Sequence, residues 1–294
     1  MSYLPAIAVV GGDARQKWLA TALQRRNALS AVYEVPDFAS PASVTVLTTP
    51  ADLCHYTCIV GPVPLARQGN LLLPPTAQQS LPLSLLLQIM QPGQLIAGGN
   101  LPAAFLQQCQ ARQIQTYDFL QSSTLTLANA EITAEGMLAI LLQQTPYVLQ
   151  NTSLLLLGYG RCGMALAHKL TALGCQVLVC ESNLEKRSLA RSFGYNVLTP
   201  EGLPAVLPTC ELLVNTVPAL VLTYDLLQLL PTQAMLFDLA SAPGGIDQQA
   251  AQQLHLYYQN CPGLPGRTAP QTAGELLAEN LLHYLATVPV SQKG

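Results

Sequence analysis

Charged side chains are scarce in this sequence. Only 10% of its 294 residues are Asp, Glu, Lys or Arg, and the formal net charge is −3. The 13 Lys and Arg residues are scattered, so they form no basic stripe of the kind that nucleic-acid binding requires. Half of the residues are apolar, and a weakly charged surface with much apolar area favours burial against a partner chain. We therefore expect an oligomer and no nucleic-acid partner.

Long apolar runs are also missing. The richest stretch, Leu81 to Met90, is interrupted by Pro82, Ser84 and Gln88, although the mean hydropathy of +0.31 is high. A membrane helix needs about 20 largely apolar residues, so we predict no membrane span. The first residues, Met1 to Pro5, carry no basic segment and lead into a strand pattern. They predict no signal peptide and a cytoplasmic protein.

The eight cysteines follow no pattern of a metal centre or a disulfide framework. Cys54-His55-Tyr56-Thr57-Cys58 offers three soft ligands with no second pair nearby, whereas structural zinc sites use four. Cytosolic thiols are normally reduced. We therefore expect free cysteines and no metal.

Short apolar runs alternate with helical patterns along the chain. The run Ala6–Val10 ends at Gly11-Gly12-Asp13 and precedes a helical stretch, Arg15–Arg26. Further strands are predicted at 31–35, 58–60, 94–97, 115–118, 153–157, 176–180, 212–215, 235–238 and 256–259, and helices at 101–111, 129–144, 164–173 and about 272–286. Residues 62–82 are rich in proline and glutamine, which is typical of loops, and the sequence leaves their structure open. Such alternation is typical of parallel sheets covered by helices.

We therefore predict an α/β protein with two Rossmann-like domains, each with a parallel sheet, joined by a long hinge helix. Residues 1–128 form the N-terminal α/β domain, which binds substrate or a partner, and 129–150 form the hinge helix and linker. Residues 151–270 form the Rossmann dinucleotide-binding domain. Residues 271–294 form a C-terminal helix that can pack back on the N-terminal domain.

The loop Gly158-Tyr159-Gly160-Arg161-Cys162-Gly163 lies between a strand and a helix and has the spacing of a dinucleotide-binding loop. Gly158 allows the tight turn, Gly160 lets a pyrophosphate approach the backbone, and Gly163 lets the helix pack near the strand. Free N–H groups at the helix start would bind the phosphates. This motif in this context predicts a nicotinamide dinucleotide site.

Glu181 stands 23 residues after the first glycine of the loop, near the spacing expected for an acid that binds the adenosine ribose. A carboxylate there favours NAD(H), because it repels the extra phosphate of NADP(H). Ser182 and Asn183 can instead hydrogen-bond a phosphate, and Lys186 and Arg187 are close in sequence. The choice between NADP and NAD therefore stays open.

Two more strand ends are predicted to line the cofactor, because ligands of open α/β sheets bind at the carboxyl ends of strands. The first is Asn215-Thr216-Val217-Pro218, and the second contains Asp238 and Ala240. Asp238 fits a turn or helix cap equally well.

Several motifs together resemble the family of the dipicolinate synthase A subunit. They are Val10–Arg15, Thr133-Ala134-Glu135-Gly136, the glycine loop, Asn215–Leu222, Asp238–Gly245 and Pro262–Pro270. The resemblance is specific across roughly 130–285 and looser over the first domain. It implies oxidation of dihydrodipicolinate, or its hydrated precursor, to pyridine-2,6-dicarboxylate, with hydride transfer to NADP+. It also implies a flavoprotein-like partner, the dipicolinate synthase B subunit, and action in the mother cell of a sporulating bacterium. Glu181 departs from the small or basic residue expected of an NADP-using member.

A dicarboxylate substrate favours guanidinium partners. Arg15 and Arg267 are the candidate anchors, with a surface arginine as the alternative for each. Asp13, Thr133 and Glu135 are candidates for the same cleft, although an acid in a first helical turn also complements the helix dipole. No residue is assigned as the catalytic acid or base.

Two other functions fit parts of the sequence. Two-domain 2-hydroxyacid dehydrogenases need a histidine near neutral pKa as acid/base catalyst, usually in a Thr-Pro-His sequence, where this chain has Cys261-Pro262-Gly263. None of the four histidines lies in a suitable loop. A non-catalytic dinucleotide sensor or scaffold fits the missing acid/base residue.

Overall fold

The computed structural model describes residues 5–77 and 79–287 in two units. Unit 1 comprises the described residues up to 128 together with those from 269, and unit 2 comprises residues 129–268. Four of the residues on which the absence of a signal peptide was predicted, 1–4, lie outside the described part, as do the last residues of the predicted C-terminal segment, 288–294.

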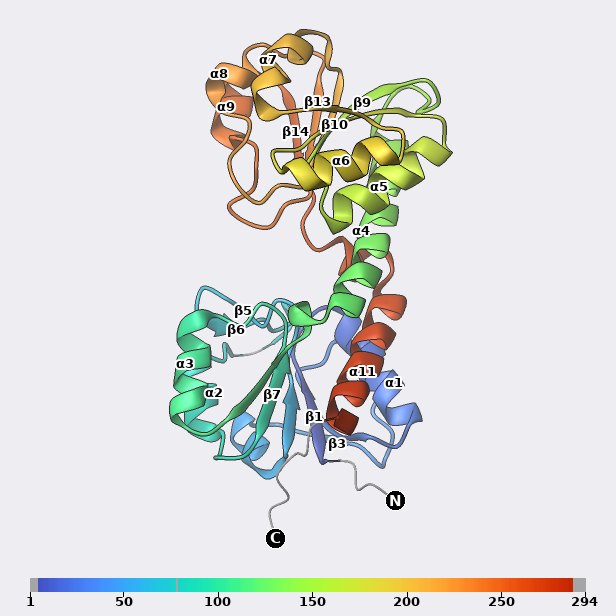
Figure 1. Ribbon diagram of the computed structural model, residues 1–294. Coiled ribbons are helices and arrows are strands. Elements are labelled where there is room, and N and C mark those ends of the chain that lie inside the picture. Colours follow the sequence, from blue (N-terminus) through green and yellow to red (C-terminus); the bar gives the residue numbers. More distant parts are fainter. Residues whose placement is uncertain (1–4, 78, 288–294) are drawn as a thin grey trace. The chain divides into compact units, whose positions relative to one another are not determined.

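Unit 1 is built on a six-stranded parallel sheet with the order β3-β2-β1-β4-β7-β8 (Figure 1). The strands are β1 (Ile7–Val10), β2 (Leu29–Tyr33), β3 (Thr45–Val46), β4 (Cys58–Val60), β7 (Leu95–Gly98) and β8 (Gln115–Asp118). The helices are α1 (Ala14–Arg25), η1 (Pro50–His55), α2 (Leu83–Ile89), α3 (Ala103–Ala111), η2 (Phe119–Gln121) and α11 (Pro270–Thr287).

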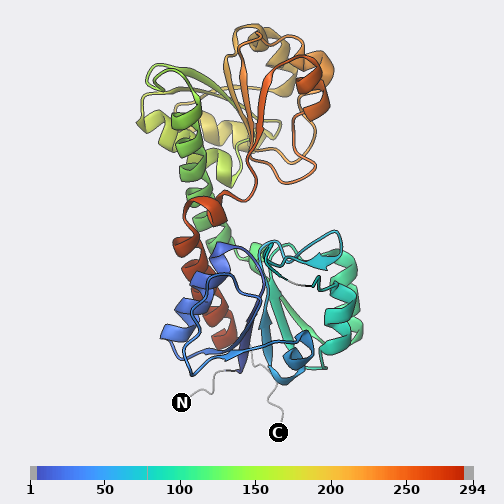
Figure 2. The ribbon, with the colours of Figure 1, turned by 180° about the vertical axis from the view of Figure 1, so that it is seen from behind.

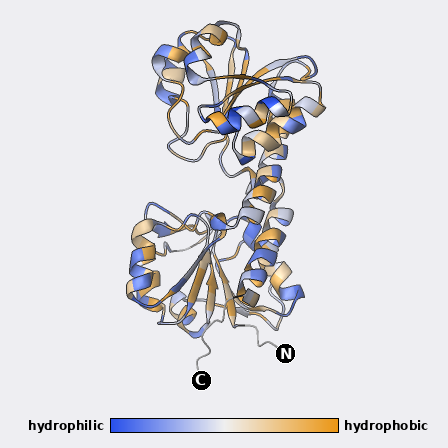
Figure 3. Ribbon diagram, in the orientation of Figure 1, coloured by the Kyte–Doolittle hydropathy of each residue, from blue (hydrophilic) through white to orange (hydrophobic). Residues whose placement is uncertain are grey.

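Alternate residues of β1 enter two different cores. Ile7 and Val9 pack in the core that α1 and α11 cover, and Ala8 and Val10 pack in the core that α2 and α3 cover. All four side chains have no exposed surface. Strands buried on both faces read as continuous apolar runs, which is why this strand was recognisable in the sequence and why it is uniformly hydrophobic (Figure 3).

Helix α11 returns to unit 1 and lies beside α1 (Figures 1 and 2). Gly274 permits this close approach, because a Cβ atom at that position would lie 2.4 Å from the Arg15 carbonyl oxygen. Two ion pairs at the surface, Arg25–Glu275 at 3.7 Å and Arg26–Glu279 at 3.1 Å, link the helices. The C-terminal helix therefore completes one face of the N-terminal unit.

Unit 2 repeats the arrangement, with a parallel sheet of order β11-β10-β9-β12-β13-β14. Its strands are β9 (Ser153–Leu157), β10 (Gln176–Cys180), β11 (Asn196–Leu198), β12 (Leu212–Asn215), β13 (Met235–Asp238) and β14 (Tyr257–Asn260). Its helices are α5 (Arg161–Ala172), α6 (Leu184–Ser192), η3 (Pro200–Gly202), α7 (Leu203–Val206), η4 (Leu207–Thr209), α8 (Tyr224–Leu227), α9 (Gln248–Gln253) and α10 (Leu264–Thr268). The predicted α/β class with two parallel Rossmann-like sheets is confirmed.

Helix α4 (Ser123–Gln144) begins in unit 1 and continues into unit 2. It starts six residues before the predicted Asn129, where the Ser122 hydroxyl accepts the Leu125 N–H at 3.3 Å. This helix is long and apolar enough to cross a membrane by length and composition alone. Its Ala134, Met137 and Leu141 are instead buried in the core of unit 2.

The segment 62–82, whose structure the sequence left open, contains a small antiparallel hairpin of β5 (Ala66–Arg67) and β6 (Asn70–Leu71). The chain beyond it returns to the glycine turn after β1, where the Leu72 carbonyl accepts the Gly12 N–H at 2.7 Å.

Candidate functional site

Each sheet places a glycine turn at the position where doubly wound folds bind ligands. The strand order reverses between β1 and β4 in unit 1 and between β9 and β12 in unit 2. Ligands bind at this switch point, beyond the carboxyl ends of the strands. The turn after β1 contains Gly11 and Gly12, and the turn after β9 contains the glycine loop that begins at Gly158.

The three glycines of the unit 2 loop meet three different surroundings. Gly158 has φ +90°, and a Cβ atom at Gly163 would lie 2.2 Å from the Gly158 carbonyl oxygen. A Cβ atom at Gly160 would meet nothing within 4 Å. The first and third glycines are therefore required by the fold, whereas the second leaves open space for a ligand at the start of α5.

The start of α5 is prepared for an anion. Gly160 is its N-cap and offers no side-chain hydrogen bond to the first turn, so the N–H groups there are available to phosphate oxygens. Arg161 is exposed at the first helical position and adds a positive charge to it. These groups fit the pyrophosphate of a dinucleotide.

The glycine turn of unit 1, in contrast, is filled by other parts of the chain and leaves no space for a ligand beside its glycines. A Cβ atom at Gly11 would lie 2.7 Å from the Leu72 carbonyl oxygen, and one at Gly12 would lie 2.1 Å from the side chain of Gln16. The Gly12 N–H already donates to Leu72. Within the described residues, the open glycine loop therefore belongs to unit 2.

The two other predicted loop residues face the protein. The Tyr159 side chain is buried in the core and lies edge-to-face with Tyr195, with ring centroids 5.7 Å apart, so the side chain is not available to a ligand. Burial raises the pKa of the Cys162 thiol, although Arg161 opposes the shift. Cys162 is therefore a protonated thiol in the first turn of α5.

Glu181 directly follows β10 and is 8% exposed. Its Oε2 accepts the Tyr159 N–H at 2.8 Å, and its Oε1 accepts the Asn183 N–H at 2.9 Å. The Ser182 hydroxyl donates to Oε1 at 3.4 Å. Burial raises the pKa of this carboxyl, but the N–H groups of Asn183 and Tyr159, the charge of Lys186 and the Ser182 hydroxyl together bring the pKa below its ordinary value. The carboxylate is a fixed negative charge at the edge of the loop.

Asn215 and Asp238 bind each other rather than point outward. They are register partners on β12 and β13, and the Asn215 amide donates to Asp238 Oδ1 at 2.7 Å. Asp238 also accepts the N–H groups of Ala240 and Gly245, each at 2.9 Å, and Asn215 bonds the backbone of Val217. Both side chains are almost fully buried.

The hydrogen-bonding groups of these two side chains hold the turns in place, and their contact with the cofactor stays a prediction. The Thr216 hydroxyl likewise donates to the Leu157 carbonyl at 2.9 Å, beside Gly158. Val217 is partly exposed, Pro218 is exposed and Ala240 is buried. Sequence reasoning missed Gly245, where a Cβ atom would lie 2.3 Å from the Asn215 amide nitrogen. The sequence feature that could have identified Gly245 is its place as the second glycine of the Pro243-Gly244-Gly245 turn.

The unit 1 substrate candidates form an ion pair with each other. Arg15 Nη2 lies 2.7 Å from Asp13 Oδ2, and its Nε donates to Asp13 Oδ1 at 2.9 Å. Arg15 also donates to the Val63 carbonyl and is 6% exposed. One edge of the guanidinium group is thus occupied by Asp13, which leaves its Nη1 as the group that a carboxylate could bind.

We expect the Asp13–Arg15 pair to make unfolding depend on pH in the acidic range. Burial raises the pKa of Asp13, but hydrogen bonds and the charge of Arg15 bring it below the ordinary 3.8. A lowered folded-state pKa stabilises the protein above pH 3.8, and this contribution is lost as pH falls through the folded-state value. Asp13→Asn should therefore show a smaller loss of denaturation midpoint between pH 5 and pH 2.5 than the unmodified chain. Asp37→Asn, at an exposed aspartate, should keep the original slope; equal slopes for all three proteins would contradict the assignment.

The unit 2 substrate candidates lie on α4 and α10. The Thr133 hydroxyl donates to the Asn129 carbonyl at 2.7 Å, and Glu135 forms an exposed ion pair with Lys169 at 3.3 Å, beside Glu131–Lys169 at 3.0 Å. Arg267 lies in helix α10 rather than in the predicted loop, and its exposed side chain has no hydrogen bond or ion pair within residues 5–77 and 79–287. Of these, Arg267 alone presents a free charged group.

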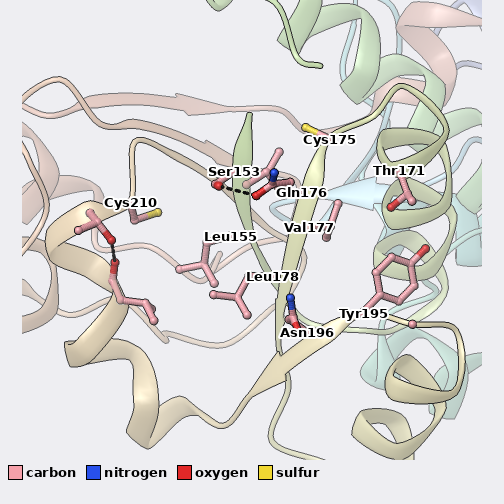
Figure 4. A pocket seen from close by; sticks show the side chains of 14 residues that line it. Ser153, Leu155, Thr171, Cys175, Gln176, Val177, Leu178, Tyr195, Asn196 and Cys210 are labelled. Atoms are coloured by element: carbon pink, nitrogen blue, oxygen red, sulfur yellow. Dashed lines mark hydrogen bonds between the residues drawn. The ribbon is translucent and has the colours of Figure 1, made fainter. Parts of the chain in front are cut away.

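A hollow of about 500 Å³ lies at the opposite edge of the unit 2 sheet (Figure 4). Ser153 and Gln176, at the amino ends of β9 and β10, and Tyr195, Asn196 and Cys210 line it. Its lining residues include no Asp, Glu, Lys, Arg or His, so it offers no charged side chain to the phosphates of a dinucleotide. The glycine loop, at the carboxyl edge, therefore remains the candidate ligand site.

Comparison with known proteins agrees with this division. Residues 6–120 match the family model for the N-terminal domain of the dipicolinate synthase A subunit, and residues 127–242 match "D-isomer specific 2-hydroxyacid dehydrogenase, NAD binding domain". Unit 2 thus contains an NAD-binding dehydrogenase-like domain. The first half, where the sequence motifs were fewer, is matched by the family's own domain model.

Individual relatives point the same way. The chain is 30% identical to the dipicolinate synthase A subunit of Bacillus subtilis (strain 168) over 168 residues, which cover 57% of each chain. The crystal structure of the A subunit from Bacillus halodurans superposes with a TM-score of 0.86 at 25% identity, covering 98% of this chain and 100% of that one. The B. subtilis dipicolinate synthase A chain gives 0.84 at 24%, covering 98% and 97%. The resemblance drawn from the motifs is confirmed.

Proposed function

We propose that this chain, which carries the N-terminal domain of the dipicolinate synthase A-subunit family, oxidises dihydrodipicolinate or its hydrated precursor to pyridine-2,6-dicarboxylate. The hydride acceptor is a nicotinamide dinucleotide, NADP or NAD. The observation that carries the proposal is the open glycine loop at the start of α5, in a chain whose residues 6–120 match that family. We also propose the dipicolinate synthase B subunit, a flavoprotein-like chain, as partner, and the cytoplasm of a sporulating mother cell as location.

The reaction requires the site mainly to bind the substrate and the dinucleotide and to orient them toward each other. Dihydrodipicolinate loses a hydride and a proton, and the product ring is aromatic, which favours the forward direction. The bound dinucleotide supplies the hydride acceptor. The N–H groups of α5 hold its phosphates, Glu181 holds its ribose, and a guanidinium group holds a substrate carboxylate. No side chain is assigned as the proton acceptor.

Arg267 is our first candidate for that guanidinium group, because its charge is unpaired within the described residues. We expect Arg267→Ala to raise the KM for the dicarboxylate by about tenfold or more, the scale of a lost charge-assisted hydrogen bond. Dinucleotide affinity should stay within about twofold. Steady-state kinetics and a fluorescence titration with reduced dinucleotide measure the two effects. An equal loss of both would place Arg267 in support of the cofactor or of α10.

The direct test incubates the purified chain with dihydrodipicolinate and either NAD+ or NADP+, with and without the flavoprotein-like partner. Formation of dipicolinate, measured by its ultraviolet absorbance, together with dinucleotide reduction supports the proposal. No dipicolinate in any mixture contradicts it.

One observation favours a second candidate, a dehydrogenase acting on a 2-hydroxy acid. Residues 127–242 match the NAD-binding domain of that family. The catalytic histidine of such enzymes has no counterpart at Cys261-Pro262-Gly263. Reduction of a 2-keto acid by the chain alone would support this candidate. Dinucleotide binding with no turnover of either substrate class would indicate a sensor or scaffold.

A further inference from the structure

We infer that the dinucleotide of this chain is NAD(H) rather than NADP(H), and that Glu181 selects it. This inference rests on the proposed dinucleotide-binding function and narrows it. The two cofactors differ only by a phosphate on the 2′-oxygen of the adenosine ribose. The residues around the carboxyl end of β10 therefore decide between them.

The Glu181 carboxylate cannot turn away from the site. The Tyr159 N–H holds one oxygen at 2.8 Å and the Asn183 N–H holds the other at 2.9 Å. Tyr159 belongs to the glycine loop, so the carboxylate is fixed to the same loop that binds the pyrophosphate. Its pKa is lowered by these N–H groups despite burial, so it remains ionised at neutral pH. Oε2 accepts a single hydrogen bond in the structure and therefore keeps a free lone pair that can accept a ribose hydroxyl.

The neighbouring polar groups that could bind a 2′-phosphate already make hydrogen bonds within the protein. The Ser182 hydroxyl donates its one hydrogen to Glu181, and Asn183 Oδ1 caps α6 by accepting the Lys186 N–H at 3.0 Å. The guanidinium group of Arg187 is turned to the backbone, where Nη1 donates to the carbonyl of Glu181 at 3.0 Å and to that of Ser182.

Beside Arg187, Lys186 is the nearby cation with an exposed side chain, and its ammonium group makes no hydrogen bond to the described residues. One flexible ammonium group on the surface contributes little, because solvent screens it and its side chain must be ordered. A 2′-phosphate carries nearly two negative charges and would lie against the fixed Glu181 carboxylate. Like charges placed side by side penalise binding strongly, so the arrangement rejects NADP(H) and accepts the two hydroxyls of NAD(H).

The test titrates the full chain with NADH and, separately, with NADPH, and follows the fluorescence of the reduced nicotinamide without any substrate. We expect the Kd for NADH to be lower than that for NADPH by about tenfold or more. Glu181→Gln removes the charge and should reduce this ratio by about tenfold. Glu211→Gln, the same change at an exposed residue at the opposite edge of the sheet, should leave the ratio unchanged. Circular dichroism confirms that each variant is folded.

The outcomes separate the inference from the function on which it rests. Tighter binding of NADPH by the unmodified chain overturns the inference and leaves the proposed function standing. Binding of neither dinucleotide overturns both. If Glu181→Gln weakens NADH and NADPH by the same factor, the carboxylate only supports the loop and its role as selector is refuted. The comparison on the unmodified chain decides the cofactor even if the Glu181 variant does not fold.

Discussion

Gly163→Ala is expected to lower the free energy of unfolding of unit 2 by about 2–3 kcal/mol, the range of overpacking a closely packed site. Gly163 lies in the first turn of α5, and in an ordinary helix alanine is more stable than glycine by up to about 1 kcal/mol. The sign is reversed here because the new methyl carbon would lie 2.2 Å from the Gly158 carbonyl oxygen, a backbone atom. The clash can be relieved only if α5 moves away from the Gly158 carbonyl at the end of β9.

Gly160→Ala is the matched comparison, three residues earlier in the same loop. Its added methyl group would meet nothing within 4 Å, and its φ of −82° suits any residue. We expect the free energy of unfolding to change by less than about 0.5 kcal/mol, as for other unstrained surface changes. Dinucleotide affinity should still fall by about tenfold or more, because the methyl group occupies the space that a pyrophosphate would enter.

Urea denaturation and titration with reduced dinucleotide measure both variants. The expected pattern is loss of stability for Gly163→Ala and loss of binding with unchanged stability for Gly160→Ala. If Gly160→Ala bound dinucleotide as tightly as the unmodified chain, the loop would not be the pyrophosphate site. If Gly163→Ala were as stable as the unmodified chain, the close approach of α5 to β9 would not be required.

The glycine loop could be predicted because its requirements are local. A buried strand, three glycines at fixed spacing and a following helix are all contained in Ser153–Ala172. Strands covered on both faces, such as β1 and β9, were visible for the same reason. Strand ends were less accurate: the strand predicted at 31–35 is β2 (Leu29–Tyr33), which stops where Glu34 adopts a positive φ of 52°.

The roles of individual polar residues could not be predicted, because they depend on contacts between distant parts of the chain. Asn215 and Asp238 are 23 residues apart and become neighbours through the parallel register of β12 and β13. The Leu72 carbonyl that bonds the Gly12 N–H lies in the long segment after β4, far from Gly12 in the sequence. Edge strands β3 and β11, of two and three residues, are too short to show periodicity.

The Asn215–Asp238 bond also carries the second large prediction, that Asp238→Ala destabilises unit 2 by about 3–5 kcal/mol. Asp238 is 1% exposed and accepts three hydrogen bonds, from the Asn215 amide and from the N–H groups of Ala240 and Gly245. Removal of the carboxylate leaves three donors without their acceptor, and each buried unsatisfied group costs about 1–3 kcal/mol. Water can reach part of the turn at the sheet edge, so the expected destabilisation is smaller than the summed cost of three unsatisfied donors.

Asp247→Ala is the control for this change. Asp247 is the N-cap of α9 and accepts the single N–H of Ala250 at 3.0 Å, so its replacement should cost about 1 kcal/mol. Urea denaturation of the three proteins at neutral pH gives both differences. Dinucleotide affinity measured on folded Asp238→Ala should also fall, because Asp238 holds Asn215 and through it Val217, next to the Thr216 hydroxyl that packs against Gly158. A loss of stability no larger than that of Asp247→Ala would show that the buried carboxylate is not what holds the two strand ends together.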